Sequence, residues 1–194
     1  MGRHSKRKVR PASPVMPSLA ALRSLWAARG PVFKFLVKFS LSLILLNAVF
    51  LLPPCQRCLI GLSQFYAIVG SHALNRIGEE SRQIGALITS IHYTLVISND
   101  CSAYDLILFL WAVAFASPAA LDRKLVGIVL GMALIFITNF LRVVTLFLVG
   151  VHRPGIFEAM HGTVWPALLV AVIVLFSIAW ASWAIRANPG HVEA

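Results

Sequence analysis

Acidic side chains are scarce in this sequence, which holds 7 Asp and Glu against 17 Lys and Arg. No acid precedes Glu79, and charged residues make up only 12% of the chain while 59% is hydrophobic. A soluble domain carries about 25% charged residues. The shortage of charge and the long apolar runs therefore exclude an ordinary soluble domain and predict an integral protein of the lipid bilayer.

Several signatures of catalysis and ligand binding are also missing. The chain has no glycine-rich phosphate loop, no HExxH zinc motif and no paired acids within its apolar runs. Of its 3 cysteines, Cys55 and Cys58 form a CxxC. Two ligands without a neighbouring histidine pair make a poor metal site. We therefore expect chemistry that needs no metal and no organic cofactor.

The excess of positive charge gathers at the amino terminus. The chain opens with "MGRHSKRKVR", and further basic residues follow up to Lys38. We interpret residues 1–31 as a basic cytoplasmic tail that sets the topology by the positive-inside rule. Nucleic acid is not an expected partner, because no aromatic or folded recognition element accompanies the charge. Residues 32–194 are expected to form a single membrane-embedded domain.

The predicted fold is an all-α integral membrane protein. Four apolar runs are long enough to be expected as transmembrane helices: Val32–Leu52, Tyr104–Ala119, Leu125–Val151 and Val164–Ile185. Leu59–Ile77 carries a polar stripe and is predicted to be an amphipathic helix in the membrane interface. "IGALITSIHYTLVISND" is rich in β-branched residues and predicts a short hairpin outside the lipid, with a turn near His92. Asp122, Arg123 and Lys124 are expected to form the turn between the second and third spans.

The direction in which the helices cross the membrane has two interpretations. The number of Lys and Arg placed inside is the same whether or not Leu59–Ile77 spans, so the positive-inside rule does not separate them. The polarity of that segment favours four spans. Cys101 is then expected on the extracytoplasmic face of a cytoplasmic membrane.

Polar residues in three segments are expected to meet at one depth. Arg142 interrupts the apolar run "ITNFLRVVTLFLVG", where a central arginine costs at least about 2.5–3.5 kcal/mol. The helical rise brings Arg142 back to nearly the level of Cys101. Asn139 and Thr145 share its face and are expected to hold the guanidinium. His161 precedes the last span on the same side, so Cys101, Arg142 and His161 can converge.

This trio permits attack by a thiolate on a peptide. The neighbouring Asp100 disfavours a thiolate, so a base or a cation is needed beside Cys101. His161 can take the thiol proton and later donate it to a leaving amine. Arg142 can stabilise an oxyanion.

Each of these residues also has an ordinary interpretation. A lone cysteine at a helix start is often incidental, a histidine before a span is often interfacial, and Arg142 can snorkel towards the headgroups. Near the end of the arginine helix, His152 and Arg153 are candidate substrate-contacting residues of lower rank.

The order C…NxxR…H resembles the exosortase/archaeosortase family of membrane cysteine transpeptidases, and most of all the short exosortase H subfamily. Here the motifs are "NDCSAYDLILF", "ITNFLRVVTLFLVG" and "GIFEAMHGTVWP". The resemblance implies that Cys101 is the nucleophile, Arg142 the essential arginine and His161 the third catalytic residue. In the stretch after the cysteine, Tyr104 and Asp105 depart from the family pattern.

The resemblance also implies a substrate class. Substrates would be exported proteins with a carboxy-terminal sorting signal, made of a short motif, a transmembrane helix and a basic cluster. The enzyme would cleave near the motif through a cysteine thioester and transfer the protein to an acceptor, which the sequence does not identify.

The CxxC provides a rival hypothesis. Cys55 and Cys58, just outside the first span, resemble part of a quinone-linked thiol-disulfide oxidase, although that family needs a second cysteine pair. A disulfide between them and two free thiols are the simpler alternatives. A third hypothesis is a small non-enzymatic membrane subunit, in which Arg142 is a polar contact between helices. The transpeptidase requires Cys101, the oxidase requires the CxxC, and the subunit requires neither.

Overall fold

The computed structural model describes residues 19–186, with side chains described for residues 30–98 and 101–186. The chain divides into two compact units, Met1–Lys34 and Phe35–Ala194. Most of the predicted basic tail lies outside the described residues. Helix α1 (Leu19–Phe50) supplies the described part of the first unit and the beginning of the second. All of the candidate site residues belong to the second unit.

The protein is mostly helical, as predicted. Its other long helices are α2 (Pro53–Arg76), α3 (Tyr104–Ala116), α4 (Leu121–His152) and α6 (Trp165–Arg186). Among the described residues, three helical stretches are long and apolar enough to cross a membrane: Gly30–Phe50, Leu121–His152 and Pro154–Arg186. Helix α3 is apolar but has 13 residues. It extends for about 20 Å, so the predicted second span, Tyr104–Ala119, is shorter than a hydrocarbon core of about 30 Å.

Helix α2 begins six residues before the predicted interfacial helix. Pro53 and Pro54 open it, which suits a first turn whose N–H groups have no helical partner. Part of the polar stripe faces inward instead of towards headgroups, because Ser63 and Ser71 are buried. Ser71 Oγ lies 3.0 Å from Ser81 Oγ, so the segment after α2 provides a partner for this serine.

The predicted hairpin is part of a three-stranded antiparallel sheet. Its strands are β1 (Arg82–Ile84), β2 (Leu87–Thr89) and β3 (Thr94–Val96), in that order. The expected turn near His92 joins β2 to β3, where the Ser90 N–H donates to the Tyr93 carbonyl at 2.8 Å. Gly85 joins β1 to β2 with a φ of 62°, which glycine adopts without strain. Ile88 and Leu95 are buried on the inner face of the sheet.

The turn between α3 and α4 lies earlier than expected. Helix α3 ends at Ala116, and Pro118 cannot continue it because proline lacks an N–H donor. The Ser117 hydroxyl accepts a hydrogen bond from the Ala119 N–H at 3.2 Å. Asp122, Arg123 and Lys124 therefore lie in the first turn of α4 and not in the turn itself. The first-turn position of Asp122 complements the helix dipole.

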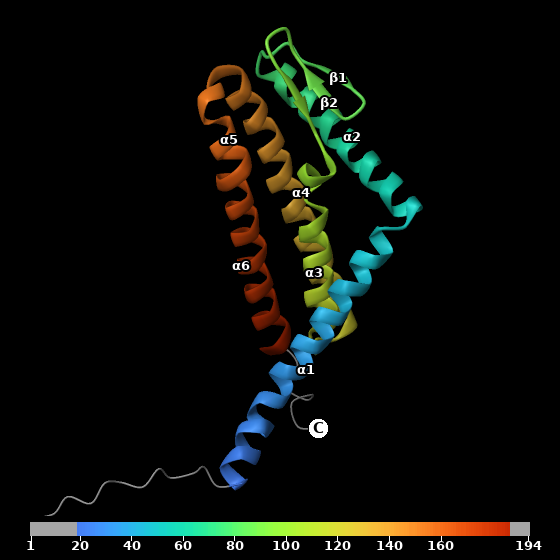
Figure 1. The fold of residues 1–194 in the computed structure, drawn as a ribbon, viewed down its shortest axis with the longest axis vertical. Coiled ribbons are helices and arrows are strands. Elements are labelled where there is room, and N and C mark those ends of the chain that lie inside the picture. The colour runs from blue at the N-terminus through green and yellow to red at the C-terminus, as the bar shows by residue number, and fades with distance from the viewer. Residues whose placement is uncertain (1–18, 187–194) are drawn as a thin grey trace, which may run out of the picture. The chain divides into compact units, whose positions relative to one another are not determined.

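Helices α3, α4 and α6 pack against one another, and the sheet and α2 lie at the end of α4 that carries His152 (Figure 1). Two glycines of α4 allow the close contacts. The ring of Trp180 packs over Gly127, and the side chain of Leu110 over Gly131. The half of α4 nearer His152, including Val143 and Phe147, forms one core cluster with Tyr66 and Leu74 of α2. This arrangement places the middle of α4 beside the segment that leads into α3.

Candidate active site

Cys101 lies in a single turn of 3₁₀-helix, η1 (Asn99–Ser102), between the sheet and α3. Its N–H donates to the Ser98 carbonyl at 3.0 Å, and only 7% of the residue is exposed. Ala103 follows with a φ of 57°, in the left-handed region that an alanine rarely adopts. Such a residue costs on the order of 1–3 kcal/mol, and strained residues cluster at functional sites. The tight turn therefore holds the thiol at the start of α3.

Three polar groups from three segments surround the thiol. The Cys101 Sγ lies 3.6 Å from Nε2 of His161 and 4.0 Å from Nη2 of Arg142. The Ser98 hydroxyl donates to the same sulfur at 3.6 Å. The sulfur thus faces a base, a cation and a hydroxyl, which are groups that can take its proton or stabilise its anion.

His161 lies in a π-helical segment, η3 (Met160–Val164), directly before α6. Pro166 follows and has no N–H to donate to the preceding turn, which is a regular cause of a distorted helix. The imidazole is half-buried and stacks on the ring of Phe157, with centroids 5.6 Å apart and an interplanar angle of 14°. Single π turns occur often at functional sites. Here the turn and the stacking orient the ring towards Cys101.

Arg142 is 6% exposed on α4. Its Nε is buried without a hydrogen-bond partner among the described residues, and no described carboxylate forms an ion pair with it. Burial of a cation without an anionic partner costs free energy, and such a residue in an apolar helix is therefore a candidate functional residue. Its guanidinium has donors available for a negatively charged group that enters the site.

Asn139 does not hold the guanidinium as expected. Its Nδ2 donates to the Cys101 carbonyl at 2.8 Å, and the residue is fully buried. Asn139 therefore fixes the backbone of the cysteine. Thr145 is also occupied elsewhere, because its hydroxyl donates to the carbonyls of Leu141 at 2.7 Å and Arg142 at 3.1 Å within its own helix. Asn139 does not bind the guanidinium because its amide donates to the Cys101 carbonyl, which η1 brings next to α4.

A cavity of about 360 Å³ opens beside these residues. It is lined by Ala103, Asp105, Leu106, Arg142, His161, Pro166, Leu169 and Val170. Two of the three polar partners of the thiol, Arg142 and His161, are in this lining. A ligand in the cavity would therefore meet the imidazole and the guanidinium, the two groups that also contact the Cys101 sulfur.

Comparison of the chain with protein-family models, with curated proteins and with solved structures finds no match.

Tyrosines beside the site are electrically neutral. Burial raises the pKa of the Tyr66 hydroxyl above its usual value, and an interaction with the Asn139 side chain opposes this shift. Burial also raises the pKa of Tyr93, which packs over Gly150 of α4. Neither group contributes a negative charge near Arg142 at neutral pH.

The two residues of lower rank lie away from the cavity. His152 Nε2 is 2.6 Å from Oε1 of Glu79, so this pair joins the end of α4 to the segment before β1. Arg153 is exposed at the end of α4, and its N–H donates to the Val149 carbonyl at 2.8 Å. Neither residue lines the cavity beside Cys101.

Cys55 and Cys58 are free thiols in the first two turns of α2, and Cys58 is exposed. Among the described residues, no group of three or more His, Cys, Asp or Glu side chains is placed to hold a metal ion.

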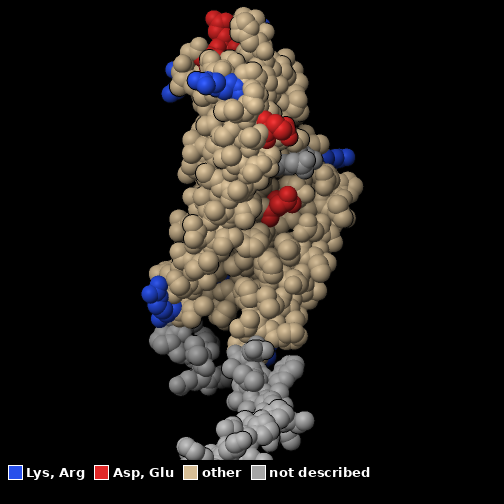
Figure 2. Space-filling model, turned by 60° about the vertical axis from the view of Figure 1, so that its left-hand side comes forward, with Lys and Arg blue, Asp and Glu red and all other residues tan. Residues whose placement is uncertain are grey.

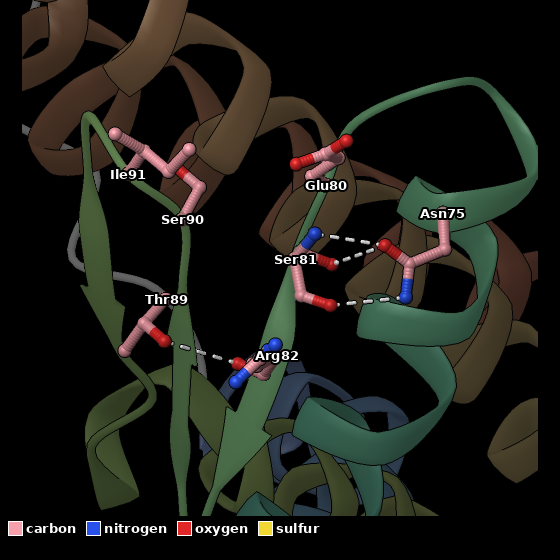
Figure 3. Close-up of a pocket in the computed structure, with 7 residues that line it drawn as sticks. All are labelled: Asn75, Glu80, Ser81, Arg82, Thr89, Ser90 and Ile91. Carbon is pink, nitrogen blue, oxygen red and sulfur yellow. Dashed lines mark hydrogen bonds between the residues drawn. The ribbon is translucent and has the colours of Figure 1, made fainter.

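A second hollow, of about 530 Å³, lies between the end of α2 and the sheet. Figure 3 shows Asn75 and Ser81 hydrogen-bonded to each other in its wall, with Glu80 and Arg82 nearby. The Asn75 amide accepts from the Ser81 N–H at 2.8 Å and donates to the Ser81 carbonyl at 3.0 Å. These bonds connect α2 to the sheet. None of the three residues around the thiol lines this hollow.

Sequence reasoning did not identify Ser98 or the π-helical setting of His161. Ser98 precedes the cysteine by three residues, where a serine often ends a strand and begins a turn. The position of Ser98, three residues before Cys101, is the sequence feature that could have identified it. The π turn has a sign in Pro166, since a proline in the second position of an apolar run disturbs the turn before it.

Proposed function

We propose that this protein is a membrane cysteine peptidase and transpeptidase that cleaves carboxy-terminal sorting signals from exported proteins. The observation that carries the proposal is the environment of one sulfur. Cys101 Sγ lies 3.6 Å from the His161 imidazole and 4.0 Å from the Arg142 guanidinium, beside a cavity that both line. The motif order that resembles exosortases supports the same assignment.

The first step is acylation of the enzyme. His161 Nε2 accepts the thiol proton, which requires the neutral tautomer with the proton on Nδ1. The Cys101 sulfur attacks the carbonyl carbon of the substrate and forms a tetrahedral oxyanion. Collapse of this intermediate forms a thioester and breaks the C–N bond. His161 gives its proton to the departing amine, which leaves with the transmembrane part of the signal.

The second step returns the enzyme to its starting state. An acceptor nucleophile, an amine or water, attacks the thioester while His161 Nε2 takes a proton from it. The C–S bond breaks, the exported protein is bonded to the acceptor, and His161 returns a proton to the sulfur. No electrons are gained or lost, so this chemistry needs no redox partner.

Arg142 and Asn139 have different roles in this scheme. The free donors of the Arg142 guanidinium stabilise the oxyanion in a site largely closed to water, where charge stabilisation is strongest. Asn139 is a positioning residue, because it holds the Cys101 carbonyl at 2.8 Å and so fixes the direction of the thiol.

We infer that the enzyme acts at the extracytoplasmic face of the cytoplasmic membrane. Its apolar helices suit a multi-pass position in the bilayer, and the basic amino terminus favours a cytoplasmic start. Its partners are exported proteins with a motif, a transmembrane helix and a basic cluster, together with an acceptor molecule.

The test is processing of an exported reporter that bears such a tail. The wild type is compared with Cys101→Ala and with a Cys55→Ser/Cys58→Ser double variant, which removes the other thiols. Loss of cleavage in Cys101→Ala alone is the expected result. Normal cleavage by Cys101→Ala would overturn the proposal. Loss only in the double variant would favour the thiol-oxidase hypothesis, which a quinone-reduction assay then tests directly.

A further inference from the structure

The cavity beside Cys101 adjoins a second one. This second cavity, of about 310 Å³, is lined by Leu43, Asn47, Asp105, Leu106, Phe109, Val170, Ile173 and Val174. It shares Asp105, Leu106 and Val170 with the cavity at the thiol. The two adjoining cavities, called the groove below, lie along α3 and α6 between Arg142 and His161 at one end and the Phe35–Phe50 part of α1 at the other.

The wall of the groove follows one face of α6. Pro166, Leu169, Val170, Ile173 and Val174 line it. Their spacing of three and four residues marks a single helical stripe. Leu169 and Ile173 are buried at its floor, whereas Val170 is 51% exposed at its edge. An apolar stripe of this length, open at one side, suits a helix that lies alongside α6.

Two polar side chains interrupt the apolar lining. Asp105 is exposed in the first turn of α3, and Asn47 lies on α1. The Asn47 Nδ2 donates to the Leu43 carbonyl at 2.9 Å, and no described residue bonds its Oδ1. Asp105 forms no ion pair among the described residues. In the middle of the face shown in Figure 2, acidic atoms stand among uncharged ones, and basic atoms lie at the right-hand edge at a similar height.

The Asp105 carboxyl group and the Asn47 Oδ1 are hydrogen-bond acceptors in an otherwise apolar groove. A ligand that fills the groove without donating to them would leave both without a partner, which is energetically unfavourable. Asp105 can stabilise the start of α3 through the helix dipole. That role does not explain why its side chain also lines both cavities. Acidic side chains in membrane-spanning segments usually face a partner, and Asp105 begins one of the predicted spans. Both groups here are acceptors, so a complementary partner must donate, and a cation does so best.

We propose that this groove binds the transmembrane helix of the sorting signal, and that Asp105 selects substrates with a lysine or arginine where the motif meets that helix. The inference rests on the proposed function for the identity of the substrate. With the motif at Arg142 and His161, the next residues of the substrate reach Asp105, and its apolar helix continues along α6. Asp105 is thus a specificity-determining residue.

Binding can be measured without catalysis. Full-length protein in lipid nanodiscs carries a photoreactive amino acid at Val170, at the edge of the groove. The probes are synthetic peptides with one leucine–alanine membrane helix, identical except for Lys, Met or Glu at its first residue. We expect the Lys peptide to crosslink about fivefold more than the Met peptide, and the Glu peptide less than either.

Variants of Asp105 test the charge. Asp105→Asn is expected to remove the preference for Lys, Asp105→Glu to keep it, and Asp105→Lys to transfer it to the Glu peptide. Glu158→Gln is the matched control, because Glu158 is an exposed acid that lines neither cavity. Equal crosslinking of the Lys and Met peptides by the wild type would overturn the inference. So would crosslinking to lipid in place of all three peptides.

The two proposals fail in different ways. If Cys101-dependent cleavage occurs but ignores the charge of the junction residue, the specificity inference is wrong and the proposed function stands. If the Lys preference persists in crosslinking while Cys101→Ala cleaves as the wild type does, the groove binds a helix and the proposed chemistry is wrong.

Discussion

Cys101 Sγ and His161 Nε2 lie 3.6 Å apart, although 60 residues separate them in the sequence. The contact joins two irregular segments, since Cys101 lies in a 3₁₀ turn before α3 and His161 in a π turn before α6. Both segments lie beside α4, which contributes Arg142 to the same sulfur. The site is therefore built from the starts of two helices and the middle of a third.

Replacement of His161 should make Cys101 less reactive. In a Cys55→Ser/Cys58→Ser background, Cys101 is the remaining thiol. We expect His161→Ala to slow its alkylation by iodoacetamide about tenfold, because the thiolate is the reacting form and the imidazole accepts the proton. The rate is measured by mass spectrometry of quenched samples.

The control for this measurement is His152→Ala. His152 pairs with Glu79 at the end of α4 and does not contact the thiol. It should leave the alkylation rate unchanged. Equal rates in all three proteins would show that His161 does not activate Cys101.

Replacement of Arg142 should separate activity from stability. We expect Arg142→Met to reduce reporter cleavage about 100-fold, which is the usual loss when an oxyanion donor is removed. The thermal midpoint in detergent should not fall, because Arg142 has no ion-pair partner among the described residues and an unpartnered Nε. Arg142→Lys should restore only part of the activity, since lysine lacks the planar fork of donors.

The opposite pattern would support a different role for Arg142. A large fall in the thermal midpoint with cleavage intact would identify it as a polar contact between helices. That is the hypothesis of a non-enzymatic subunit.

Asn139→Ala should weaken both the fold and the reaction. The variant leaves the Cys101 carbonyl without its donor at 2.8 Å. A buried unpaired group costs about 1–3 kcal/mol, and the thiol loses its support. We expect a lower free energy of unfolding and a lower rate of cleavage.

Thr145→Val is the comparison for Asn139→Ala. The Thr145 hydroxyl donates to carbonyls of its own helix, so its removal should have little effect on cleavage. If the two variants cleave equally well, the bond from Asn139 to Cys101 does not position the nucleophile.

Much of this arrangement follows from the pattern of apolar residues. The extents of α4 and α6 agree with the predicted spans within a few residues, because long apolar runs end where charge or proline begins. The common depth of Cys101 and Arg142 follows from the fixed rise of a helix. Their catalytic roles stay predictions until the variants are measured.

Other features depend on contacts that no local pattern encodes. The left-handed conformation of Ala103, which separates η1 from α3, has no sign in the sequence. The burial of Ser71 depends on Ser81, ten residues later. Polar residues such as Asp122 favour loops between helices, which is why the sequence predicts a loop here. Aspartate also suits the first turn of a helix, where the structure places Asp122.

Two glycine-to-alanine substitutions should change stability in opposite directions. A Cβ at Gly127 would lie 2.2 Å from Nε1 of Trp180, whereas a Cβ at Gly61 on α2 would meet no atom within 4 Å. Alanine favours a helix over glycine by about 1 kcal/mol. We therefore expect Gly61→Ala to raise the thermal midpoint in detergent.

Gly127→Ala should lower the midpoint despite the same gain in helix propensity. Trp180 is buried and its indole N–H donates to the Arg123 carbonyl at 3.0 Å, so the ring cannot move aside without losing that bond. Helix α6 would have to separate from α4, and small residues at such contacts are what allow close packing in membranes. A Gly127→Ala midpoint at or above that of the wild type would mean that α4 and α6 do not pack through this glycine.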